Sequence, residues 1–177
     1  MSLPHLAVTF LFIVASQAAL AWKPEIGEIP SEISSYDYVD ESLLSLEALR
    51  GSPVVLYFGA DWCAPCQKAR PVVAHVAKTY ADLGLKVVFI SSDDNYLRDA
   101  KRVEEVQLGF RIAMPKLSVC PIRSCPSGTA SLGAFGRVYT YPSAVLIDRA
   151  GVVADKLERG EGVSRGLESA VKALLAR

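Results

Sequence analysis

A strand-to-helix junction near residue 60 constrains the fold of this chain more than any other feature. The run "PVVLYFGA" is almost wholly apolar, as in a parallel strand buried on both faces of a sheet. It leads into "DWCAPCQKARP" and then into apolar residues at helical spacing, ending near Gly84. The sequence therefore predicts a buried strand followed at once by a helix, with Cys63 and Cys66 at the junction.

The rest of the chain continues to alternate strands with helices. "LKVVFISS" predicts a second buried strand, residues 95–109 a charged, exposed helix, and "FRIAMPKLSV" a further short strand. "SAVLID" and "VVADKLE", joined by a turn at "RAG", predict an antiparallel hairpin, and residues 164–177 predict an amphipathic helix. This order of elements predicts an α/β sandwich around a mixed sheet.

Composition limits the classes of function. A chain of 177 residues with 51% hydrophobic residues is long enough for one compact core. Its 19 Lys and Arg residues equal its 19 Asp and Glu residues, so no overall field favours a nucleic acid. We therefore expect one folded domain that does not bind nucleic acid.

The first residues predict a secretory signal peptide at residues 1–21. They contain no Asp, Glu, Lys or Arg before Lys23, and the apolar run "LAVTFLFIVA" is too short to span a bilayer comfortably. The run is followed by Ala19-Leu20-Ala21, a small-x-small cleavage site, and an uncleaved membrane anchor is the alternative. Residues 22–42 are interpreted as a lead-in segment and residues 43–177 as the folded domain. The expected location is the periplasm, with secretion or membrane anchoring as alternatives.

The position of Cys63 and Cys66 favours redox chemistry. At the start of a helix, Cys63 faces unpaired backbone N–H groups and the positive end of the helix dipole, which stabilise an attacking thiolate. Pro65 fits the first turn, where no N–H is needed, and Cys66 is placed one turn on to resolve a mixed disulfide. An inert disulfide and a zinc site completed by Cys120 and Cys125 are the alternatives.

The stretch "VVLYFGADWCAPCQKARP" resembles the active-site strand and helix of the thioredoxin superfamily. "SLEALRGSPVVLYF" and "VVFISSDD" are similar to the exported TlpA-like thioredoxins and to tryparedoxin and nucleoredoxin, and the likeness covers about residues 43–176. It implies a thioredoxin-like three-layer α/β/α sandwich with a central mixed sheet, a β-hairpin and a C-terminal helix. Tyr141-Pro142 matches the cis-proline of this family, which packs against the active-site disulfide and helps to hold substrate.

The resemblance implies a thiol-disulfide oxidoreductase that reduces protein disulfides, without a metal or organic cofactor. Cys63 and Cys66 are its catalytic residues, and Trp62, Tyr141 and Pro142 contact protein thiol or disulfide substrates. In an oxidising compartment a reductase needs a membrane electron donor, by resemblance one of the CcdA or DsbD kind. A disulfide-forming oxidase and a non-enzymatic binding module are the alternatives.

Three positions depart from the family pattern. Tyr57 stands where thioredoxins proper carry a buried Asp, Phe89 where they carry a Lys, and Tyr141 where Ile, Val or Thr precedes the cis-proline. Proton transfer from Cys66 must therefore use another group or water. A bulky phenol beside the disulfide is expected to narrow the range of substrates or to supply a hydrogen bond.

The second cysteine pair, Cys120 and Cys125, has no counterpart in the family pattern. The loop "CPIRSCPSG" predicts a structural disulfide, with an auxiliary redox pair or a metal site as alternatives. Closing so short a loop adds about 2 kcal/mol or less through chain entropy. Such a disulfide would therefore stabilise the fold only modestly, so a second role for this pair stays an alternative.

Overall fold

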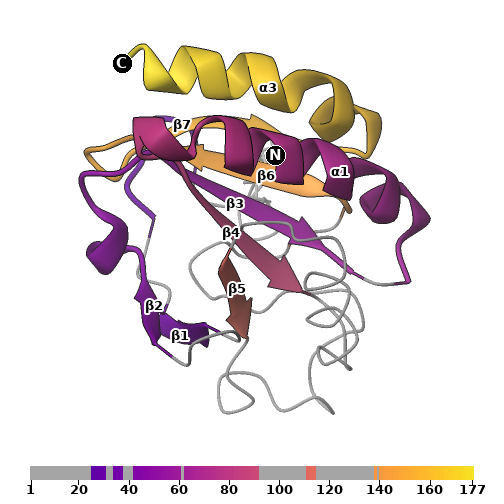
Figure 1. The fold of residues 1–177 in the computed structure, drawn as a ribbon, viewed down its shortest axis with the longest axis horizontal. Helices are drawn as coiled ribbons and strands as arrows, with labels where there is room; N and C mark the ends of the chain where they lie inside the picture. Colours follow the sequence, from indigo (N-terminus) through magenta and orange to yellow (C-terminus); the bar gives the residue numbers. More distant parts are fainter. Residues whose placement is uncertain are drawn as a thin grey trace, which may run out of the picture.

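The computed structural model describes residues 25–30, 34–37, 42–60, 62–91, 111–114, 138 and 140–177, which form a sheet with helices laid across it (Figure 1). Three sequence predictions lie outside these residues. They are the signal peptide at residues 1–21, the charged helix at residues 95–109, and the second cysteine pair, Cys120 and Cys125.

The described strands form one seven-stranded mixed sheet with the order β2-β1-β5-β4-β3-β6-β7. Strands β3, β4 and β5 run parallel, whereas β6 is antiparallel to β3 and forms a hairpin with β7. Both the mixed sheet and the hairpin were predicted and are confirmed. The strand bounds are β1 Ser34–Asp37, β2 Leu43–Ser45, β3 Val54–Gly59, β4 Lys86–Ser91, β5 Arg111–Met114, β6 Ser143–Ile147 and β7 Val153–Leu157.

Strand β3 lies inside the sheet and has all six residues buried. Val55 and Tyr57 belong to the core beneath the helices, whereas Leu56 and Phe58 belong to the core on the opposite face. Because successive side chains of a strand point to opposite faces, only an unbroken apolar run suits a strand that is covered on both sides. The carboxyl end of β3, at Gly59, leads into the cysteine motif.

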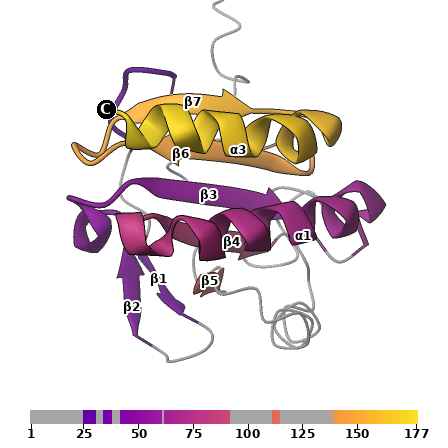
Figure 2. The same ribbon diagram turned by 45° about the horizontal axis from the view of Figure 1, so that its top comes forward.

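Helices α1 (Ala64–Thr79) and α3 (Glu161–Leu175) lie side by side on one face of the sheet (Figures 1 and 2). Short 3₁₀ helices, η2 (Glu47–Leu49) and η3 (Ala81–Leu83), flank β3 and α1. The buried residues of α3 recur every three or four positions, which is the spacing of one helix face. They are Val163, Leu167, Val171 and Leu174.

A polar contact joins the two helices at the end of α1. The Tyr80 hydroxyl donates a hydrogen bond to Glu168 Oε1 at 3.1 Å, and Lys172 Nζ lies 2.9 Å from the same oxygen. The hydrogen bonds from Lys172 and then Tyr80 hold the pKa of Glu168 below its ordinary value of 4.5. This contact is on the surface and has no part in the cysteine site.

The described part of the chain agrees with the thioredoxin-like fold class in its mixed sheet, with both described α-helices on one face (Figure 2). The charged helix predicted at residues 95–109 is outside the described part of the chain, so no α-helix is described on the opposite face. On that face, the described part of the core includes Leu44, Leu49 and Val138.

Part of the predicted lead-in segment belongs to the sheet. Strand β1 pairs with β2 and β5, so the sheet begins at Ser34, upstream of the domain boundary predicted at residue 43. Further upstream, Gly27 N–H donates to the Val153 carbonyl at 2.8 Å, and Val153 N–H donates to the Glu28 carbonyl at 2.9 Å. These backbone bonds tie residues ahead of β1 to the edge strand β7.

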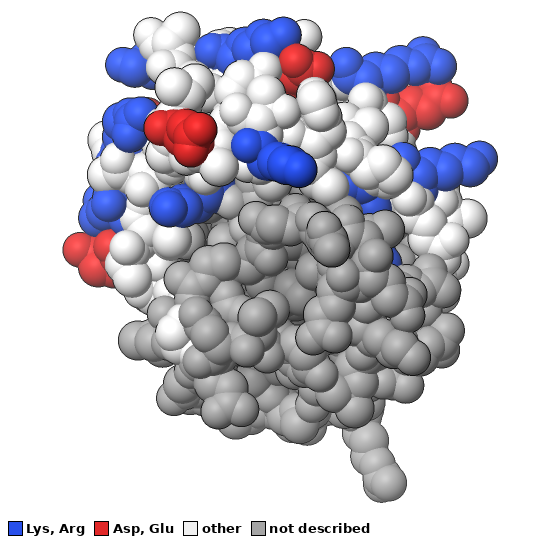
Figure 3. Space-filling model, viewed as in Figure 1, with Lys and Arg blue, Asp and Glu red and all other residues white. Residues whose placement is uncertain are grey.

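Side chains of both signs lie on the described surface (Figure 3). The described part of the face in Figure 3 carries both basic and acidic side chains, in keeping with equal totals of 19 Lys and Arg and 19 Asp and Glu. Among the described residues, no helix is long and apolar enough to cross a membrane.

Candidate active site

Cys63 and Cys66 form a disulfide at the junction that the sequence singled out. Strand β3 ends at Gly59, α1 begins at Ala64, and the Cα atoms of the two cysteines are 5.2 Å apart. Cys63 is 5% exposed and Cys66 is 0% exposed. Cys63, which the sequence predicts to attack a substrate, is therefore the more exposed of the two cysteines.

The start of α1 places a hydrogen-bond donor at the Cys63 sulfur. Cys63 is the N-cap of the helix, and the backbone N–H of Cys66 donates to Cys63 Sγ at 3.2 Å. Pro65 occupies the first turn, where its missing N–H costs no helical bond. In the reduced protein, a Cys63 thiolate would thus meet an N–H donor and the positive end of the helix dipole.

The predicted substrate-contacting residues lie together around the disulfide. Trp62 is 64% exposed, and its ring meets the Tyr141 ring edge to face, with centroids 6.0 Å apart. Tyr141 packs against the cluster of Ala60, Cys63 and Cys66. Pro142 is buried, and the Tyr141–Pro142 peptide bond is cis, as the resemblance implies. The structure therefore brings all five predicted site residues of this motif to one place.

Tyr57 supplies a hydroxyl at the position where thioredoxins proper, by the resemblance, carry a carboxylate. It is fully buried, and its hydroxyl donates to the Cys66 carbonyl at 3.0 Å. Phe89 is its partner across the β3–β4 pair, with ring centroids 5.4 Å apart. Two packed aromatic rings therefore occupy the positions at which thioredoxins proper carry Asp and Lys.

Arg70 is a residue that the sequence analysis missed. It is only 5% exposed, and it is the only buried charged side chain among the residues for which the structure describes burial. Its guanidinium carbon lies 5.2 Å from the centroid of the Phe89 ring. The signal was available in the spacing, because Arg70 follows Cys66 by four residues and therefore lies on the same helix face.

The structure describes no metal site near this disulfide. Within the described ranges there is no group of three or more His, Cys, Asp or Glu side chains that could hold a metal ion. The alternative of a zinc site shared with Cys120 and Cys125 involves residues outside those ranges.

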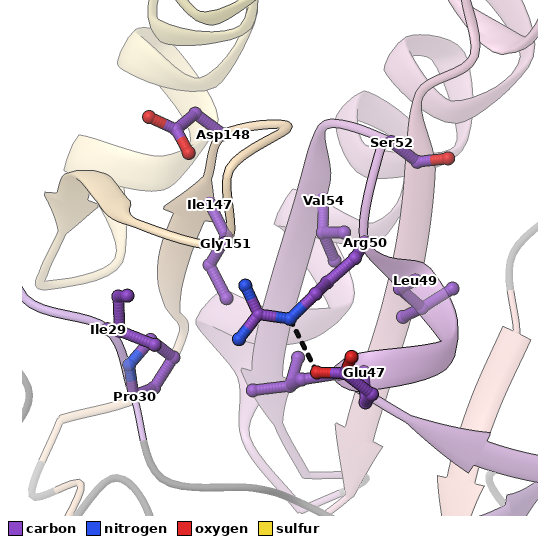
Figure 4. A pocket seen from close by; sticks show the side chains of 11 residues that line it. Ile29, Pro30, Glu47, Leu49, Arg50, Ser52, Val54, Ile147, Asp148 and Gly151 are labelled. Atoms are coloured by element: carbon purple, nitrogen blue, oxygen red, sulfur yellow. Dashed lines mark hydrogen bonds and ion pairs between the residues drawn. The ribbon is translucent and has the colours of Figure 1, made fainter.

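A small pocket lies at the other end of β3 (Figure 4). Its lining includes the apolar side chains of Ile29, Leu49 and Ile147, together with Glu47 and Arg50. Arg50 forms an ion pair with Glu47 and donates to the Ala150 carbonyl at 3.0 Å. Arg50 therefore links η2 to the turn between β6 and β7. Neither Cys63 nor Cys66 lines this pocket.

Fold and site together define a thioredoxin-like protein with a dithiol-disulfide centre at the start of its first helix. The chain belongs to the AhpC/TSA family, whose family model it matches over residues 36–156. This confirms the thioredoxin-like resemblance that was predicted from the active-site motif.

Named relatives agree with this class. The chain is 28% identical over 125 residues to a thiol-disulfide oxidoreductase ResA of Bacillus cereus. That match covers 71% of this chain and 65% of the relative, slightly less than two thirds of its length.

Solved structures share the fold. One is a thiol:disulfide interchange protein of the thioredoxin family from Chlorobium tepidum TLS, with a TM-score of 0.65 and 23% identity, covering 86% of this chain and 99% of that one. Another is a DsbF homologue from Corynebacterium diphtheriae, with a TM-score of 0.65 and 20% identity, covering 94% of this chain and 100% of that one.

Proposed function

We propose that this protein is a thiol-disulfide oxidoreductase that reduces disulfides in protein substrates. The observation that carries the proposal is the Cys63–Cys66 disulfide at the start of α1, with the Cys66 N–H donating to Cys63 Sγ. The name of the ResA relative supports the same class of activity.

The reaction follows from the two positions of the cysteines. The Cys63 thiolate attacks a substrate disulfide, forms a mixed disulfide and releases one substrate thiolate. Cys66 loses its proton and attacks Cys63 Sγ, so that the second substrate thiolate leaves and the Cys63–Cys66 disulfide forms. Two electrons pass from the protein to the substrate, and the two substrate thiols take up the protons that the protein dithiol gives up.

Reduction is the direction that we propose, because Ala-Pro between the cysteines resembles the reducing members of the superfamily. The direction is tested by equilibrating the Cys63–Cys66 couple with glutathione. A potential near about −270 mV marks a reductant, and one near about −120 mV marks an oxidant. The second value would replace our proposal with the oxidase alternative.

The activity itself is tested by reduction of insulin with the dithiol form of the protein. Wild-type protein is expected to precipitate insulin chains, and the Cys63→Ser variant is expected not to do so. Equal rates for the two proteins would contradict the proposal. If Cys63→Ser and Cys66→Ser also left function in the cell intact, the binding-module alternative would be favoured.

Tyr141 is proposed to set substrate preference. Replacing it with Thr removes the ring that packs on Trp62 and on the cysteine cluster, and an aromatic pair contributes about 0.5–1.5 kcal/mol beyond its buried area. We expect Tyr141→Thr to change the ratio of rates between two disulfide peptides, one with aromatic and one with charged flanking residues, by about two- to tenfold. Tyr141→Phe, which keeps the ring, is the matched control. Unchanged ratios in Tyr141→Thr would remove this role.

Export is part of the proposal. Residues 1–21 have the pattern of a signal peptide, so we propose cleavage after Ala21 and action in the periplasm, with secretion or membrane anchoring as alternatives. In that oxidising compartment the protein would need re-reduction, for which we propose a membrane electron donor of the CcdA or DsbD kind. Mass spectrometry that found mature protein starting at Met1 would exclude cleavage.

Cys120 and Cys125 are proposed to form a structural disulfide. Replacing both with Ser distinguishes this role from that of an auxiliary redox pair. Unchanged turnover with a lower melting temperature supports the staple, whereas slower turnover in a stable protein supports electron exchange with the Cys63–Cys66 centre.

A further inference from the structure

The resolving step creates a buried negative charge. Cys66 is 0% exposed and packs in a cluster with Ala60 and Cys63, against which Tyr141 lies. To attack Cys63 Sγ, the Cys66 thiol must first become a thiolate, and burial among apolar groups disfavours the charged form of a thiol. The helix start offers less help here than at Cys63, because Cys66 lies inside α1 whereas Cys63 is its N-cap.

A buried positive charge lies on the same side of the helix. Arg70 follows Cys66 by four residues, so the two side chains are neighbours on one face of α1. Both are buried, with exposures of 5% for Arg70 and 0% for Cys66. The guanidinium of an arginine keeps its positive charge even when it is buried, so this face of α1 carries a fixed charge.

The Phe89 ring lies next to the Arg70 guanidinium and, like Cys66, borders Gly59. The Arg70 guanidinium carbon lies 5.2 Å from the Phe89 centroid. Gly59 leaves a gap in which a Cβ atom would lie 3.2 Å from Phe89 Cε2 and 3.5 Å from Cys66 Cβ. One edge of the Phe89 ring and the Cβ of Cys66 therefore border the same position, and the Arg70 guanidinium lies over that ring.

We propose that Arg70 is a positioning residue for the resolving step, whose buried positive charge stabilises the Cys66 thiolate that attacks Cys63 Sγ. This inference rests on the proposed thiol-disulfide exchange. In the resolving step Cys66 loses its proton to solvent and forms a bond with Cys63 Sγ. The bond between Cys63 and the substrate sulfur breaks, and that sulfur leaves with the electron pair of the bond. Arg70 exchanges neither electrons nor protons in this step.

The expected size of the effect follows from two opposing trends. Removing the positive charge lowers the fraction of Cys66 present as thiolate, which slows resolution. A more basic thiolate is also a better nucleophile, with a Brønsted coefficient of about 0.4–0.5, so part of the loss is offset. We therefore expect resolution to slow by about three- to tenfold in Arg70→Met.

The experiment uses the reduced protein and 5,5′-dithiobis(2-nitrobenzoate), in a Cys120→Ser, Cys125→Ser background. Attack by Cys63 releases the first nitrothiobenzoate in a phase that depends on reagent concentration. Resolution by Cys66 releases the second in a phase that does not. Arg70→Met should slow the second phase and change the first by less than about twofold, because the N–H donor at Cys63 is retained.

Control variants separate charge from packing. Arg70→Lys keeps the charge and is expected to restore the second phase to within about threefold of wild type. Lys68→Met removes an exposed charge from the same helix and should leave both phases unchanged, because water screens that charge. If Arg70→Met fails to fold, Arg70→Gln takes its place.

The outcomes also separate this inference from the proposed function. A second phase with the wild-type rate in Arg70→Met or Arg70→Gln overturns the inference, as does an Arg70→Lys variant that folds like wild type but is as slow as Arg70→Met. Release of only one nitrothiobenzoate per molecule of the wild-type background protein contradicts the proposed function itself, because the Cys63–Cys66 disulfide then does not form.

Discussion

Replacing Cys66 with Ala is expected to trap the protein as a covalent mixed disulfide between Cys63 and a substrate, while turnover falls by about a thousandfold or more. Cys63 keeps its N-cap position and its backbone N–H donor, so the first attack still occurs. The resolving thiol is lost, and only a second molecule can release the substrate, without the advantage of intramolecular attack. Mass spectrometry after incubation with a disulfide-bonded peptide measures the adduct directly.

The matched variant is Cys63→Ala. It should lose turnover to a similar extent but form no adduct, because Cys66 is 0% exposed and cannot reach a substrate. Both variants are best made with Cys120 and Cys125 replaced by Ser. The second cysteine pair then can neither form an adduct with the substrate nor resolve one. An adduct in Cys63→Ala and none in Cys66→Ala would mean that the two roles are reversed.

Phe58→Ala is expected to destabilise the fold by about 3–5 kcal/mol, a large share of the roughly 5–15 kcal/mol that is typical of a domain. Phe58 is 0% exposed on the face of β3 opposite α1 and α3, in a cluster that includes Val88 and Ile90. Removing the ring loses its transfer free energy and leaves a cavity that a central strand cannot close. Urea unfolding of the disulfide form, followed by circular dichroism, measures the change.

Leu83→Ala provides the control for this measurement. Leu83 is 56% exposed in η3, so the same kind of truncation should change the free energy of unfolding by no more than about 0.5 kcal/mol. Equal losses in the two variants would mean that the core on that face of β3 does not stabilise the domain as its burial indicates.

Sequence reasoning was most successful where one local pattern determines one element. The apolar run of β3 predicted a buried strand, and the helical spacing after Cys66 predicted a helix. The structure confirms both predictions. The hairpin of β6 and β7 follows from two short apolar runs joined by a turn.

Strand β1 shows the opposite case. Its sequence, "SSYD", has neither an apolar run nor an alternating pattern, and it was interpreted as part of a lead-in segment. Its pairing with β2 and β5 comes from backbone hydrogen bonds to strands that are distant in the sequence. No pattern within four polar residues could have indicated those partners.

The sequence by itself determined the redox centre and its setting. Cys63, Pro65 and Cys66 at the end of a buried run fix a dithiol at a helix start, because helix N-termini have unpaired N–H groups whatever the rest of the fold does. Tertiary structure alone decided what surrounds that dithiol. The Tyr57 hydroxyl reaches the Cys66 carbonyl and Arg70 lies over Phe89 only because β3, β4 and α1 pack together, and such contacts depend on distances between elements rather than on local spacing.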